Sequence, residues 1–79
     1  MNKEILRRLI NIPKSGFAIR LNFLMSEQKI TTTELAKLTH SSWYIVEDWV
    51  LGKDIPPKHK IDILCLIFDV RFSWLLNGK

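Results

Sequence analysis

The chain has 79 residues and a mass of 9.3 kDa, enough for one small domain whose stability is marginal unless it is well packed or oligomeric. With 47% hydrophobic and 25% charged residues it has the composition of a folded domain, not of a disordered segment. A lone cysteine, Cys65, excludes an internal disulfide, and the sequence offers no Cys/His cluster for structural zinc. The apolar runs are too short to span a bilayer and there is no secretory signal pattern. We therefore expect a cytoplasmic domain without cofactors.

The basic excess is concentrated at the N-terminal end of the chain. The formal net charge is +4; residues 1–20 hold five basic residues against one acidic residue, whereas residues 21–79 hold seven of each. A local basic excess favours a polyanionic partner such as nucleic acid. A charge of this size is also compatible with an ordinary solvated surface, so it does not decide the function alone.

Apolar residues recur at spacings of three and four along the chain, which predicts an all-α domain of five or six short helices. The first predicted helix, residues 2–10, places Ile5, Leu6, Leu9 and Ile10 on one face and ends before Pro13. We assign residues 1–14 to this basic amphipathic helix and residues 15–79 to the rest of a single domain.

A second helix is expected from about residue 16 to Ser26. Its inward stripe consists of Phe17, Leu21 and Leu24, with Ala18 and Met25 beside it.

The strongest local signal is the segment that begins at Thr31. Thr31 followed three residues later by Glu34 predicts a capping box, which opens a short helix from Thr32 to about Leu38. Residues 39–42 are poor helix formers, so we expect a turn there. A further helix should then begin near Ser42 and end near Leu51, with Gly52 as a left-handed C-cap.

A helical wheel divides this further helix into two faces. The face assigned to the core consists of Ile45, Val46 and Trp49. The opposite face, expected to meet solvent or a partner, consists of Trp43, Tyr44, Glu47, Asp48 and Leu51.

The proline pair Pro56–Pro57 is expected to open the next helix. Its core positions are Ile61, Leu64, Cys65 and Phe68, and a last helix should run from Phe72 to Leu76 and end at Gly78. Further apolar residues make the longer helix apolar on nearly every side, which indicates burial or contact with a second subunit. The candidate dimer surfaces are therefore Ile63, Leu66 and Ile67, or the Ile5/Leu9 stripe.

Two short helices joined by a turn of about four residues have the spacing of a helix-turn-helix, although ordinary αα-hairpins share it. In this setting the chain resembles the lambda-repressor-like helix-turn-helix domains, above all the N-terminal DNA-binding domain of phage CI-type repressors. The resemblance covers about residues 15–79. It is carried by Phe17-x-x-Arg20-Leu21, Leu35-Ala36-Lys37, Trp49-x-x-Gly52-Lys53-x-x-Pro56 and Val70-x-x-x-Trp74-Leu75-Leu76-x-Gly78.

The resemblance implies a compact five-helix fold that binds operator DNA, usually as a homodimer, in the cytoplasm or nucleoid of a bacterial host. It also implies that the chain ends where the DNA-binding domain ends, without a separate oligomerisation domain. Thr32 and Lys53 would contact the DNA backbone. The base-reading positions would be Ser42, Trp43, Tyr44 and Glu47.

Some positions depart from the family pattern. His40 stands where Gly is usual in the turn, and Ser41 stands where a buried aliphatic residue is usual. We expect His40 to adopt the left-handed backbone conformation. We also expect Leu38 to supply the apolar contact that Thr39 does not. The outward face carries aromatic and acidic residues where Gln, Arg, Asn or Ser is expected.

That departure motivates a second hypothesis, a protein-interaction module that uses Trp43, Tyr44, Glu47 and Asp48 on a helix-turn-helix scaffold. An enzyme is not expected, because the sequence contains no paired carboxylates, no Ser/His/Asp set and no phosphate-binding glycine loop.

Overall fold

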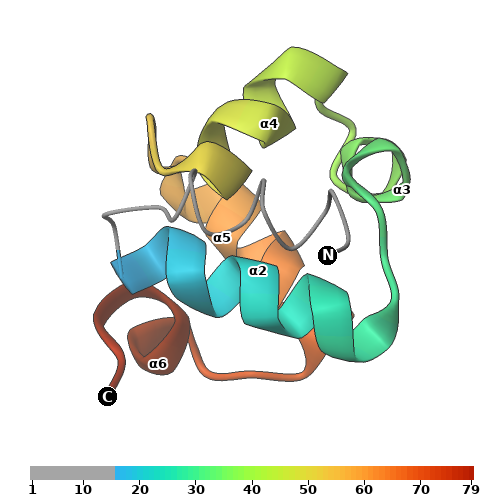
Figure 1. Cartoon of the computed structure of the whole chain (residues 1–79). Coiled ribbons are helices and arrows are strands. Elements are labelled where there is room, and N and C mark those ends of the chain that lie inside the picture. Colours follow the sequence, from blue (N-terminus) through green and yellow to red (C-terminus); the bar gives the residue numbers. More distant parts are fainter. Residues whose placement is uncertain (1–15) are drawn as a thin grey trace, which may run out of the picture.

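A computed structural model describes residues 16–79; the expected helix of residues 2–10 lies outside the described residues. The described part is built of helices alone, as the apolar spacing predicted (Figure 1). It contains α2 (Gly16–Gln28), α3 (Thr32–Leu38), α4 (Trp43–Leu51), α5 (Lys58–Phe68) and α6 (Phe72–Asn77).

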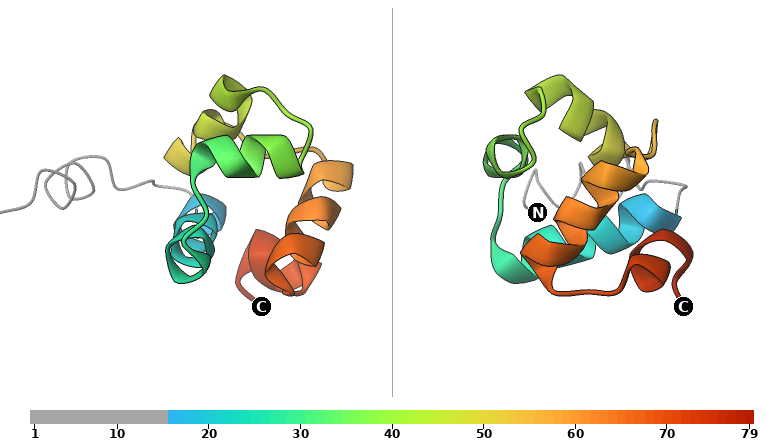
Figure 2. Two further views of the ribbon diagram at one scale, coloured as in Figure 1. Left: turned by 90° about the vertical axis from the view of Figure 1, so that its right-hand side faces the viewer. Right: turned by 180° about the vertical axis from the view of Figure 1, so that it is seen from behind.

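Helix α2 presents the predicted stripe to the interior. It is two residues longer than expected, and its five buried residues are the five assigned to the core from the sequence: Phe17, Ala18, Leu21, Leu24 and Met25. In Figures 1 and 2 this helix lies across the other elements, with its first turn beside α6 and its last turn leading to α3. Helix α2 packs directly against α4 and α6, while α3 packs against α4 and α5 against α6.

Every described helix contributes to one hydrophobic core. Its largest fully buried side chains include Trp49 of α4, Leu35 of α3, Leu64 of α5 and Leu75 of α6. Burying a side chain of this size stabilises a fold by about 1.5–3 kcal/mol relative to leaving it in water. Residues from 17 to 75 thus share a single interior, which fixes the relative positions of α3 and α4.

Three positions of the α3–α4 region differ from expectation. Ile45 was assigned to the core, but it is 40% exposed; the core contacts of α4 are made by Val46 and Trp49. The expectation that Leu38 replaces Thr39 in the interior is also wrong, because Leu38 is half-exposed and Thr39 is fully buried. A helix of seven or nine residues gives too few turns for a wheel to fix the inward direction closely.

Two polar side chains of α2 connect distant elements. The guanidinium of Arg20 donates from Nε to the carbonyl of Leu75 and from Nη2 to that of Leu76, both at 2.9 Å. Asn22 Nδ2 donates to the carbonyl of Val50 at the end of α4, at 2.8 Å. These bonds anchor the last turns of α6 and α4 to α2.

Gly78 ends α6 where this anchor lies. Its φ is +78°, a left-handed conformation that glycine adopts without steric cost. A Cβ at this position would lie 3.0 Å from Arg20 Nη1. The glycine therefore both reverses the chain and leaves room for the guanidinium.

None of the helices described between residues 16 and 79 is both long and apolar enough to cross a membrane.

Candidate nucleic-acid interface

Helix α3 begins with the predicted capping box. Thr31 Oγ1 accepts a hydrogen bond from the Glu34 N–H at 3.2 Å, and Glu34 Oε1 accepts one from the Thr31 N–H at the same distance. Two of the N–H groups that helix geometry leaves without partners are thereby satisfied. The box sets the start of α3 at Thr32, as the sequence predicted.

The connection from α3 to α4 is a tight reversal in which His40 is left-handed, with φ +52°. The exposed imidazole therefore occupies the turn position expected of it. The preceding residue, Thr39, can be buried because its hydroxyl donates to the carbonyl of Leu35 at 2.8 Å. The Ser41 N–H donates to the carbonyl of Ala36 at 2.9 Å, which closes the reversal.

A lysine from α5 holds this connection in place. Lys60 Nζ donates to the carbonyl of Thr39 and, at 3.3 Å, to that of His40. An ammonium is well suited to carbonyls at the end of a helix, where the backbone carries partial negative charge. Sequence reasoning missed this role because 21 residues separate Lys60 from Thr39, and a lysine on a helix has no local signature of a distant partner.

Helices α3 and α4 lie at a steep angle to each other. In Figure 1 α3 is seen end-on, whereas α4 extends across the view. The two helices pack against each other, and their buried residues Leu35, Ala36 and Val46 belong to the shared core. Gly52, with φ +76°, ends α4 as a left-handed cap. At its other end α4 lacks a side-chain cap, because the hydroxyl of Ser42 makes no capping hydrogen bond.

The predicted site residues occupy four places. Ser42, Trp43 and Tyr44 lie together at the exposed beginning of α4, with Trp43 51% and Tyr44 66% exposed. Glu47, one turn further along, is half-buried, and the exposed Lys53 follows the end of the helix. Thr32 is half-buried in the first turn of α3 and also lines a groove against α2. Of the six predicted DNA contacts, three therefore lie together at the start of α4. Thr32, Glu47 and Lys53 lie outside this group.

The described part of the chain is close to neutral. Residues 16–79 contain eight basic and seven acidic side chains, a formal net charge of +1, and two of the acids, Glu47 and Asp48, belong to α4. Most of the basic excess therefore belongs to residues 1–15. Among the described residues no three His, Cys, Asp or Glu side chains lie together as they would in a metal site.

Comparison with known proteins finds no relative: no family model, curated protein or solved structure matches the chain.

Proposed function

We propose that this chain is a DNA-binding transcriptional regulator of the phage-repressor kind. In this proposal α3 and α4 act as a helix-turn-helix, α4 enters the major groove of operator DNA, and two copies bind as a homodimer. Leu66, which is 83% exposed, with the half-buried Ile63 and Ile67 beside it on α5, would supply the dimer contact. Such a regulator would act in the cytoplasm or nucleoid of a bacterial host.

The observation that best supports the proposal is the uncapped, exposed beginning of α4. The Ser42 hydroxyl makes no capping hydrogen bond and lies with the N–H groups of Trp43 and Tyr44 at this exposed start, whereas the Thr31 hydroxyl at the start of α3 is engaged in its capping box. A helix N-terminus attracts phosphate through these N–H groups and through the helix dipole. Trp43 and Tyr44 beside it would then reach base edges, where an aromatic ring packs on a thymine methyl.

The remaining roles follow from position. Glu47 would accept a hydrogen bond from cytosine N4. Lys53 and Thr32 would contact phosphates, which position the protein without reading sequence. Lys60 would act indirectly, because it fixes the carbonyls of the turn and hence the angle at which α4 leaves α3.

A salt titration of binding to duplex DNA tests the proposal. With about six phosphate contacts, the logarithm of the association constant should fall with the logarithm of salt concentration with a slope of about −5. Lys53→Gln should make that slope shallower by about one, whereas Lys79→Gln, at the chain end, should leave it unchanged. Absence of binding to any duplex at about 50 mM salt would contradict the proposal.

A second candidate function, docking of a partner protein, is favoured by the apolar surface around the same turn. Leu38, Trp43, Tyr44 and Ile45 are each at least 40% exposed. Aromatic residues dominate the energetics of protein interfaces, and Glu47 and Asp48 repel DNA phosphates. This function predicts that a Trp43→Ala variant loses a protein partner, while the full chain shows no salt-dependent affinity for duplex DNA.

A further inference from the structure

The outward side of α4 combines each of its exposed aromatic rings with a carboxylate one turn further along. Trp43 is followed four residues later by Glu47, and Tyr44 by Asp48. Both rings are more than half exposed, and both acidic residues are half-buried. Among residues 16–79, neither carboxylate takes part in a hydrogen bond or an ion pair. Both carboxylates therefore remain free to accept hydrogen bonds from a molecule that covers this face.

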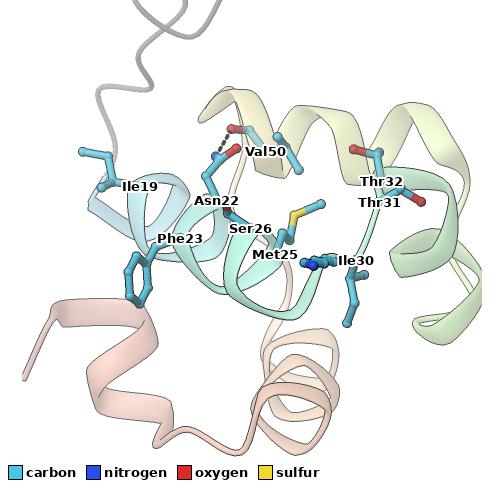
Figure 3. Close-up of a pocket in the computed structure, with 10 residues that line it drawn as sticks. Ile19, Asn22, Phe23, Met25, Ser26, Ile30, Thr31, Thr32 and Val50 are labelled. Atoms are coloured by element: carbon cyan, nitrogen blue, oxygen red, sulfur yellow. Dashed lines mark hydrogen bonds between the residues drawn. The ribbon is translucent and has the colours of Figure 1, made fainter. Parts of the chain in front are cut away.

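This face is held in place from both ends of the helix. Asn22 Nδ2 on α2 donates to the carbonyl of Val50 near the end of α4, at 2.8 Å (Figure 3). At the other end, Lys60 of α5 donates to the carbonyls of Thr39 and His40 in the preceding turn. A base contact tolerates only small displacements, so a reading helix needs such support. The aromatic and acidic side chains are thus presented by a helix that is anchored at both ends.

The residue types of α4 exclude the usual contacts to purines. Arginine or lysine reads guanine, and asparagine or glutamine reads adenine, through paired hydrogen bonds in the major groove. The helix Trp43–Leu51 contains none of these four residue types. Ser42, whose hydroxyl can donate or accept, discriminates little between bases. The helix therefore lacks side chains for bidentate recognition of either purine.

A carboxylate selects cytosine among the four bases. It only accepts hydrogen bonds, and covering it without a donor costs free energy. In the major groove cytosine presents the N4 amino donor, whereas guanine presents two acceptors and thymine presents one. Adenine has an amino donor too, but its neighbouring N7 acceptor repels the second carboxylate oxygen. Glu47 has the longer reach of the two acids, because its side chain has one methylene more than that of Asp48.

The aromatic rings select thymine. The thymine C5 methyl is the apolar group that base edges present in the major groove. Four residues along a helix correspond to about 6 Å, and one base-pair step to about 3.4 Å. A base contacted by the Trp43–Tyr44 pair and a base contacted by Glu47 thus lie one or two base pairs apart.

We propose that α4 selects operator half-sites in which a thymine, packed on the Trp43–Tyr44 pair, lies one or two base pairs from a cytosine that donates from N4 to Glu47. The purines paired with these two bases make no hydrogen bond to α4. This inference rests on the proposed function, since it names the bases that the same helix reads.

Base analogues in the duplex test the proposal without altering the protein. Selection of bound duplexes from a random pool by the full chain gives the site, in which the thymine and the cytosine should be enriched at that spacing. Replacing this thymine with uracil removes only the methyl group and should weaken binding about fourfold. Replacing the paired purines with their 7-deaza analogues removes N7 and should leave the affinity unchanged.

A pair of protein variants tests the role of Glu47. Glu47→Gln should reduce the preference for cytosine about tenfold, because glutamine pairs with adenine instead. Asp48→Asn, the matched control, removes the same charge from the same face and should leave that preference unchanged. Both variants lose one negative charge, so a general gain in affinity for DNA should appear in both, and only the base preference separates them.

The outcomes separate a failure of this inference from a failure of the proposed function. If the wild-type chain binds no duplex at about 50 mM salt, the proposed function fails and the base preference fails with it. If the chain binds with salt-dependent affinity, but uracil costs nothing or a 7-deaza purine weakens binding, the proposed function stands and the pyrimidine reading is wrong. An unchanged cytosine preference in the Glu47→Gln variant would likewise overturn the role of that residue.

Discussion

At the scale of single residues, the α3 segment shows how position decides what a threonine does. Thr31 is exposed and uses its hydroxyl to begin a helix, whereas Thr39 is buried and returns its hydroxyl to the carbonyl of Leu35. Only the first role was predictable, because the capping box depends on two residues three apart. The second requires knowing which side of α3 faces the core, and Leu38 looked the better candidate from hydrophobicity alone.

Removing the cap should weaken the fold measurably. Thr31→Ala deletes the hydroxyl that accepts from the Glu34 N–H, and we expect the free energy of unfolding to fall by about 1 kcal/mol. Urea denaturation followed by circular dichroism measures the change. Thr31→Ser, which keeps the hydroxyl, serves as the control and should lose only a small part of this stability.

Cys65 should react slowly as a thiol. Burial raises its pKa, and the negative charge of Asp62 raises it further. The thiolate is the reacting form, and a raised pKa makes the thiolate fraction at neutral pH smaller than in an unstructured peptide. The same shift favours the folded state below the thiol pKa of the unfolded chain, and this contribution is lost as the pH rises through the folded-state pKa.

The pH dependence of the reaction with an aromatic disulfide reagent measures this pKa. The midpoint for the folded chain should lie above that of a cysteine peptide, and Asp62→Asn should lower it. A midpoint at or below the peptide value would show that the thiol is not shielded.

At the scale of elements, the helices were predictable from the sequence, but the side-chain hydrogen bonds that connect them were not. The stripe of α2, the start of α3 and the glycine end of α4 follow from patterns within a few residues, and all three are confirmed. The outward Ile45 was not predicted, because α4 has only nine residues. The bonds made by Arg20, Asn22 and Lys60 link residues 20 to 56 positions apart, and no local pattern announces them.

The clearest of these attachments is that of α6 to α2. Arg20→Met removes two charge-assisted hydrogen bonds and leaves the carbonyls of Leu75 and Leu76 without that donor, so the free energy of unfolding should fall by about 1.5–3 kcal/mol. Arg20→Lys should retain only part of the unfolding free energy that Arg20→Met loses, because a single ammonium does not reproduce the two parallel donors of the guanidinium. Arg71→Met, at an exposed arginine that immediately precedes α6, is the matched control. Equal denaturation midpoints for the Arg20→Met and Arg71→Met variants would contradict this anchor.

At the scale of the whole molecule, shape and charge are divided between two parts of the chain. Residues 16–79 provide the packed α3–α4 pair and have a nearly neutral total charge, whereas residues 1–15 hold four basic side chains against one acidic side chain. The resemblance to phage repressors pointed to α4 as the reading element, and its start is indeed exposed. The aromatic and acidic character of that face is visible in the sequence, but whether it selects DNA or a protein depends on a partner that no sequence pattern identifies.

In the proposed function the outer side of α4 reads duplex DNA and does not serve the core. Trp43→Ala and Tyr44→Ala, measured together for unfolding free energy and for affinity to operator-length duplexes, test it most directly. We expect both variants to keep a stability within about 0.5–1 kcal/mol of the parent chain and to lose DNA affinity by about tenfold or more per residue. Trp49→Ala, in the interior, should by contrast cost about 3–5 kcal/mol of stability. If the variants at Trp43 and Tyr44 keep full affinity for DNA, or lose as much stability as the Trp49 variant, the outer side of α4 does not read DNA.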